Sequence, residues 1–124
     1  MGRVFLDANV VIDFLERKEA ETRNRLKSNT LYITPLSIHI LLYLMRLRIP
    51  YSKLTEIKQY FSIIEFNESI MYSALGGPTD DFEDNVQLHS AAEAECDLFL
   101  TEDKRLIGMK FFGKTRITGI QALQ

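Results

Sequence analysis

The chain of 124 residues predicts an α/β domain built on a parallel sheet, with helices packed against that sheet. Two observations carry this prediction: short apolar runs typical of strands recur along the chain, and longer segments with helical spacing separate them. The strand-like runs cover residues 3–6, 31–34, 62–66, 97–101 and 115–118. Because parallel strands need a crossover between them, this alternation favours parallel pairing in a sheet of about five strands.

Composition sets the broad class of the protein. A hydrophobic content of 46% suffices for one core, so we expect a single domain over residues 1–124. The 15 Lys and Arg against 17 Asp and Glu give a net charge of -2, so any nucleic-acid contact must use a local patch. The single cysteine, Cys96, and the absence of an apolar leader predict a cytoplasmic protein. The longest apolar run, residues 40–45, is too short to cross a membrane, so no membrane partner is expected.

Three segments between the strands predict helices. Residues 10–29 favour one or two helices, with Asn9 as the cap. Residues 81–96 form the clearest case, with Asp81 as N-cap and Asp84 placed to answer it in a capping box. The segment 35–49 is apolar on both sides, which indicates either a partner chain or burial under a second helix near residues 54–61.

Acidic residues stand where a parallel sheet places its sites. Asp7 follows the first predicted strand and Asp103 follows the fourth. The carboxyl ends of parallel strands meet at one edge, which is where open α/β folds bind ligands. The helix from Asp81 leads into the fourth strand, so its first turn brings Asp84 to the same edge. We therefore expect three carboxylates to lie close together.

Three neighbouring carboxylates repel one another unless a cation compensates. Mg²⁺ or Mn²⁺ suits such a group, because both ions prefer oxygen ligands and complete their shells with water and substrate phosphate. Such an ion activates water and neutralises charge on a phosphodiester. No zinc site is indicated, because His39 and His89 lack Cys or His partners at zinc spacing.

Three stretches together resemble the PIN domain family, and more closely its VapC-like toxins: "FLDANVVIDFL", "ITPLSIHILLYL" and "DFEDNVQLHSAAEAECDLFLTEDKRL". The resemblance implies a three-layer α/β/α fold with a central, mainly parallel sheet, and the activity of a metal-dependent endoribonuclease. It assigns metal binding and catalysis to Asp7, Asp84 and Asp103. Asn9 and Thr101 match positions that commonly support the first and last acids. RNA as substrate and a protein antitoxin as partner follow from the same resemblance.

One position departs from the pattern of that family. A glutamate usually lies in the helix after the second strand, and the matching position here is Ile40. Residues 31–55 contain no Asp or Glu, so a shift of the alignment does not restore the acid. Asp81, Glu83 or Glu102 are conceivable substitutes. With one acid fewer, a single or weakly bound ion is expected.

Each acid also has an ordinary structural alternative. Asp7 and Asp84 can serve as helix caps, and Asp103 can be a turn residue. The leading interpretation is a metal-dependent ribonuclease that forms a homodimer or binds an antitoxin. The alternative is a PIN-like RNA-binding or protein-interaction module with weakened catalysis. A receiver-like phosphoacceptor is disfavoured, because no acidic pair follows the first strand.

Overall fold

The computed structural model describes residues 2–17 and 20–123, in which strands and helices alternate. The strands are β1 (Arg3–Leu6), β2 (Thr30–Ile33), β3 (Phe61–Ile63), β4 (Leu98–Leu100), β5 (Phe111–Phe112) and β6 (Thr115–Thr118). The α-helices are α1 (Ala8–Ile12), α2 (Ala20–Leu26), α3 (Pro35–Leu44), α4 (Leu54–Tyr60), α5 (Glu68–Leu75), α6 (Phe82–Glu93) and α7 (Lys104–Met109). A π-helix, η1 (Asp13–Arg17), continues α1, and a 3-10 turn, η2 (Ile120–Ala122), follows β6.

The strands form one sheet in the order β3-β2-β1-β4-β6-β5. All neighbouring pairs are parallel except β5 and β6, which are antiparallel. The predicted α/β class and mainly parallel sheet are confirmed, with six strands instead of five. The additional strand, β5, has only two residues, so it leaves no alternating pattern in the sequence.

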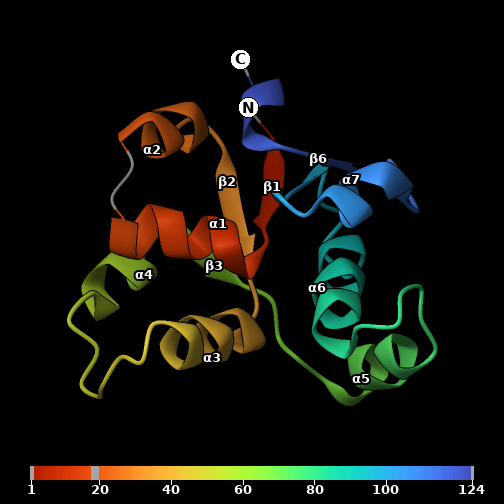
Figure 1. Ribbon diagram of the computed structural model, residues 1–124, viewed down its shortest axis with the longest axis horizontal. Coiled ribbons are helices and arrows are strands. Elements are labelled where there is room, and N and C mark those ends of the chain that lie inside the picture. Colours follow the sequence, from red (N-terminus) through yellow and green to blue (C-terminus); the bar gives the residue numbers. More distant parts are fainter. Residues whose placement is uncertain (1, 18–19, 124) are drawn as a thin grey trace.

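Helices cover both faces of this sheet (Figure 1). Val4 and Leu6 of β1 belong to a core cluster with α1, η1, α2 and α3, whereas Phe5 belongs to a second cluster with α6 and α7. Successive strand residues point to opposite faces, which explains this division. The ring of Phe5 stacks on that of Phe99 of β4, with centroids 5.3 Å apart. The three-layer α/β/α arrangement is therefore confirmed.

The first helix begins earlier than the sequence predicts. Asp7 caps α1, because its Oδ1 accepts a hydrogen bond of 2.7 Å from the backbone N–H of Ala8. Asn9, the expected cap, lies inside α1 and is exposed. A carboxylate directly after a strand thus turns the chain into the helix. Asp7 is therefore a helix cap, as the structural alternative proposed, and it also lies at the carboxyl edge of the sheet.

The segment after β2 is only partly covered. Ile40 and Leu41 of α3 are buried, whereas Tyr43 is 75% and Leu44 is 54% exposed. The second helix, α4, ends at Tyr60, and Phe61 belongs to β3, where it pairs with Leu31. The predicted helix over residues 54–61 is therefore one residue too long, because strand pairing takes Phe61. Within residues 2–17 and 20–123, no helix is long and apolar enough to span a membrane.

Candidate functional site

Asp7 lies at the carboxyl end of β1, in the middle of the sheet. Its side chain is 5% exposed, and its Oδ2 accepts a hydrogen bond of 2.6 Å from the hydroxyl of Thr101. Burial raises the pKa of Asp7 above its ordinary value, although hydrogen bonds from Thr101, Ala8 and Gln87 partly oppose the rise. The protein therefore fixes both oxygens of a carboxylate that burial penalises.

Threonines lie on both sides of Asp7. The parallel register pairs Phe5 with Tyr32 and Leu6 with Leu100, so two further steps along β2 place Thr34 beside Asp7 and one further step along β4 places Thr101 there. Thr34 is fully buried, and its hydroxyl oxygen has no hydrogen-bond partner among the described residues. A buried polar atom without a partner is uncommon. The Thr34 hydroxyl is therefore a further oxygen atom available to a ligand at this edge.

Asp84 reaches the same edge from the first turn of α6. Asp81 is the N-cap of that helix, as predicted, since its Oδ1 accepts a hydrogen bond of 3.0 Å from the Asp84 N–H. Burial, together with the charges of Asp81, Asp7 and Asp103, raises the pKa of Asp84 to about 6. Asp84 Oδ2 also lies 3.7 Å from Nη2 of Arg105, which follows β4, so Asp84 shares this edge with the residues after that strand.

Asp103 completes the group just after β4. Its N–H donates a 3.0 Å hydrogen bond to the Thr101 hydroxyl, and its Oδ1 accepts one of 2.8 Å from the Arg105 N–H. Asp103 is thus the N-cap of α7. Partial burial raises the pKa of Asp103, but hydrogen bonds from the Arg105 backbone and side chain and from the Leu106 backbone lower it to a net value below the usual range.

The cation of Arg105 lies close to two of these acids. Nη2 of Arg105 is 3.4 Å from Asp103 Oδ2 and 3.7 Å from Asp84 Oδ2. The Arg105 side chain is 69% exposed, so water surrounds most of this bridge. One guanidinium therefore joins the first turns of α6 and α7.

Two buried amides that the sequence analysis missed also hold the site. Oε1 of Gln87, which is 1% exposed, accepts a hydrogen bond of 3.0 Å from the Ala8 N–H next to Asp7. Oδ1 of Asn85 accepts from the N–H and the hydroxyl of Thr79, at 2.9 and 2.6 Å. Asn85 Nδ2 donates to the carbonyls of Ala74 and Thr79. Amides are usually exposed, so the pattern of α6 gave little reason to bury them.

The position matched to the family's glutamate faces the same helix. Ile40 is 8% exposed and lines a cavity of about 270 Å³ together with Glu83, which precedes Asp84 in α6. Of the other conceivable substitutes, Glu102 accepts a hydrogen bond of 3.3 Å from the Ile120 N–H. Ile40 therefore lies near the first turn of α6.

The donor set suits a hard divalent ion, although it is not already arranged around one. Among residues 2–17 and 20–123, no three His, Cys, Asp or Glu side chains are spaced to hold a metal ion. Oxygens of Asp84 and Asp103 nevertheless both lie within 3.7 Å of one positively charged guanidinium. The chemistry of these residues therefore fits Mg²⁺ or Mn²⁺.

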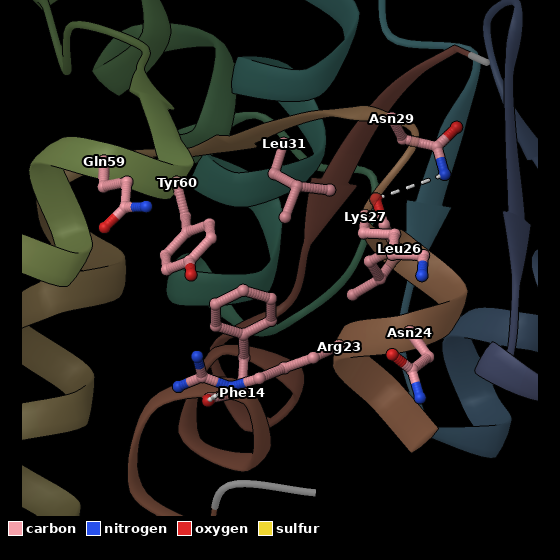
Figure 2. A pocket seen from close by; sticks show the side chains of 9 residues that line it. All are labelled: Phe14, Arg23, Asn24, Leu26, Lys27, Asn29, Leu31, Gln59 and Tyr60. Atoms are coloured by element: carbon pink, nitrogen blue, oxygen red, sulfur yellow. Dashed lines mark hydrogen bonds between the residues drawn. The ribbon is translucent and has the colours of Figure 1, made fainter. Parts of the chain in front are cut away.

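A separate cavity of about 380 Å³ lies near the amino end of β2 (Figure 2). The guanidinium of Arg23 packs 4.6 Å from the ring centroid of Phe14 and 5.7 Å from that of Tyr60. Arg23 Nε also donates a hydrogen bond of 3.0 Å to the Phe14 carbonyl. Asn29 and Leu31 place this cavity at the start of β2, whereas the carboxylates follow the strand ends. The cavity and the carboxylates therefore lie at opposite ends of the strands.

No protein-family model and no curated protein matches the chain. Solved structures share its fold. VapBC2 from Rickettsia felis, bound to a DNA fragment from its promoter, has a TM-score of 0.70 at 15% identity, over 94% of this chain and 98% of the other. A toxin–antitoxin complex from Klebsiella pneumoniae has a TM-score of 0.63 at 14% identity, over 82% and 88% of the two chains. FitAB bound to an IR36 DNA fragment has a TM-score of 0.60 at 16% identity, over 98% of this chain and 97% of the other. These likenesses support the VapC-like fold that the resemblance implies.

Proposed function

We propose that the protein is a metal-dependent endoribonuclease, the toxin of a toxin–antitoxin pair, which hydrolyses phosphodiester bonds in RNA. The observation that carries this proposal is that two contacts link the three carboxylates at the carboxyl ends of the strands: the Thr101 hydroxyl bonds Asp7 and the Asp103 N–H, and Arg105 lies against Asp103 and Asp84. The fold shared with VapBC2 and FitAB supports it. Mg²⁺ or Mn²⁺ is the proposed cofactor, with these three carboxylates as its ligands.

The chain's own residues prepare this site in three ways. Thr101 and the N–H of Ala8 orient the two oxygens of Asp7. Asp81 fixes the first turn of α6 and with it the backbone of Asp84. A bound divalent ion supplies charge that favours ionised carboxylates, activates water and offsets the negative phosphodiester.

An apolar surface on α3 supports the proposed protein partner. Tyr43 and Leu44 are exposed, and so is Ile49, which follows the helix and is 75% exposed. Exposed apolar groups of this size are typical of surfaces that another chain covers. We assign the antitoxin or a second copy of the chain to this surface, and the structural neighbours are themselves described as complexes of this class.

A second candidate function rests on Ile40. With an apolar side chain at the position of the family's glutamate, the protein is alternatively a PIN-like RNA-binding or protein-interaction module with weakened catalysis. In that case the carboxylates bind metal poorly and RNA binds without being cut.

Cleavage of labelled RNA with Mn²⁺ and with EDTA tests the two functions. Cleavage should require the ion and should disappear in Asp7→Asn, Asp84→Asn and Asp103→Asn. Glu93→Gln, an exposed acid at the far end of α6, is the matched control and should cut normally. Cleavage that persists in EDTA contradicts the metal mechanism. RNA binding without cleavage at any Mn²⁺ concentration establishes the binding module instead.

A further inference from the structure

Arg105 lies at the carboxyl edge of the sheet, next to Asp84 and Asp103, which we call the acidic edge. Its backbone holds it there, and its side chain extends from α7 toward α6. Its N–H donates a hydrogen bond to Asp103 Oδ1, which fixes the start of α7. Its Nη2 then lies within 3.7 Å of Asp84 Oδ2, on a different helix. The contact therefore joins the first turns of α6 and α7 across the carboxyl edge of the sheet.

The position of this guanidinium matters because the proposed function assigns the same two carboxylates to a divalent ion. Nη2 lies 3.4 Å from one carboxylate oxygen and 3.7 Å from the other, so it occupies the space between them. A divalent ion between the same oxygens would meet a positive charge at close range, which is unfavourable. The guanidinium and the ion therefore exclude one another there.

The bridge is also weak enough to open. Arg105 is 69% exposed, and exposed ion pairs contribute little to stability because water and salt screen them. The side chain can therefore swing into solvent without disturbing a core. Asp84, by contrast, is 15% exposed, so it stays in place when Arg105 leaves.

We infer that Arg105 is a built-in counter-cation that neutralises Asp84 and Asp103 in the metal-free protein and withdraws when a divalent ion binds. This inference rests on the proposed function. It makes Arg105 a positioning residue that sets the affinity of the site for the ion: the guanidinium reduces carboxylate repulsion in the metal-free protein, and the site binds metal less tightly as a result.

Calorimetric titration with Mn²⁺ tests the inference on the full chain. Arg105→Gln should bind Mn²⁺ about three- to tenfold more tightly than the parent, since it removes the competing charge. Arg105→Lys keeps the charge and should stay close to the parent. Lys104→Gln removes an exposed charge from the same helical turn and is the matched control. In EDTA, Arg105→Gln should also unfold at a lower temperature than Lys104→Gln, because Asp84 then lacks a partner.

The outcomes separate the two proposals. Equal Mn²⁺ affinity in Arg105→Gln and the parent, with binding lost in Asp84→Asn, overturns the role of Arg105 and leaves the metal site intact. Tighter binding in Lys104→Gln to the same degree overturns it as well, because general charge then explains the effect. If neither the parent nor Arg105→Gln binds Mn²⁺, the proposed metal-dependent function is wrong. The proposed competition between Arg105 and the ion is then wrong as well.

Discussion

Asp84 should make the stability of the metal-free protein depend on pH. Burial and neighbouring carboxylates raise its pKa to about 6, from an ordinary value of 3.8. The folded state therefore binds this proton more tightly than the unfolded state, and stability falls as pH rises between these two values. One unit of pKa corresponds to about 1.4 kcal/mol, and partial solvation of Asp84 reduces the expected effect to about 1–2 kcal/mol.

Asp84→Asn removes this penalty, so we expect it to stabilise the protein by about 1–2 kcal/mol at pH 7.5. Below about pH 3 the carboxyl is protonated in both states, and the gain should vanish. Urea unfolding in EDTA at the two pH values measures the difference. Asp80→Asn changes an exposed acid nearby and is the control. An equal gain at both pH values would contradict a raised pKa at Asp84.

Ile40 allows the missing acid to be restored. Ile40→Glu places a carboxylate on α3 beside the first turn of α6, within a small cavity shared with Glu83. We expect tighter Mn²⁺ binding, and a loss of about 2–4 kcal/mol of stability in EDTA, because the charge is buried without a partner. Calorimetry and urea unfolding measure the two effects.

Ile40→Gln is the matched control for this change. Glutamine has nearly the same shape as glutamate and no charge, so this variant should lose stability without any gain in Mn²⁺ affinity. If Ile40→Glu is also destabilised without a gain in affinity, position 40 does not face the carboxylates, and the match to the family's glutamate is wrong.

Among the elements, the loop between α5 and α6 depends on one side chain. Asn85 is 3% exposed, and its amide binds Thr79 and the carbonyl of Ala74. Asn85→Ala leaves these buried groups without partners, which should destabilise the protein by about 2–3 kcal/mol in urea unfolding. It should also weaken Mn²⁺ binding, because the loop sets the start of α6.

Ser90→Ala provides the comparison for Asn85. Ser90 is fully buried in the same helix, but its hydroxyl bonds only within α6, to the Val86 carbonyl. Its loss should cost at most about 1 kcal/mol and should leave Mn²⁺ affinity unchanged. Similar losses in both variants would mean that Asn85 does not hold the loop.

The elements also show how far the sequence predicts this fold. The five longer strands were found because each is rich in β-branched, leucine or aromatic residues, although β3 covers Phe61–Ile63 where residues 62–66 were predicted. The helix α5 was missed, although Asn67 caps it by accepting a hydrogen bond from the Ile70 N–H, a signal that the sequence contains. The short strand β5 depends on pairing with β6 through a turn at Gly113, whose φ is 61°. Such a pairing leaves little local signal.

At the candidate site, the sequence predicted which strand ends share an edge, but it did not predict the side-chain contacts between helices. The strand ends of a parallel sheet share an edge, so the closeness of Asp7 and Asp103 followed from topology alone. The contact of Arg105 with Asp84 and the burial of Gln87 depend on how α6 and α7 pack against the sheet. Sequence spacing does not contain that information, because the partners come from different elements.

For the whole molecule, the exposed apolar surface on α3 predicts assembly. We expect the isolated chain to form a homodimer, with Leu44 at the contact. Leu44→Glu should weaken association by about tenfold or more, because a charge would be buried in an apolar contact. Sedimentation velocity over a range of concentrations measures this change.

Leu75 serves as the control for that surface. It is 67% exposed at the end of α5, so Leu75→Glu adds the same charge elsewhere and should leave association unchanged. A parent chain that stays monomeric at high concentration contradicts the homodimer, and the surface is then left to the antitoxin.

The central position of β1 has a consequence for synthesis on the ribosome. β1 is the first strand made, yet its neighbour β4 comes late, and the bond from Thr101 to Asp7 joins residues 94 apart in the chain. A nascent chain stopped before β4 therefore carries Asp7 without its hydrogen-bond partner or Asp103, and one side of β1 is left unpaired. Contacts so distant form late and slow folding. Translation therefore assembles the acidic edge only when nearly the entire chain has emerged, so the proposed ribonuclease would gain activity only at the end of its own synthesis.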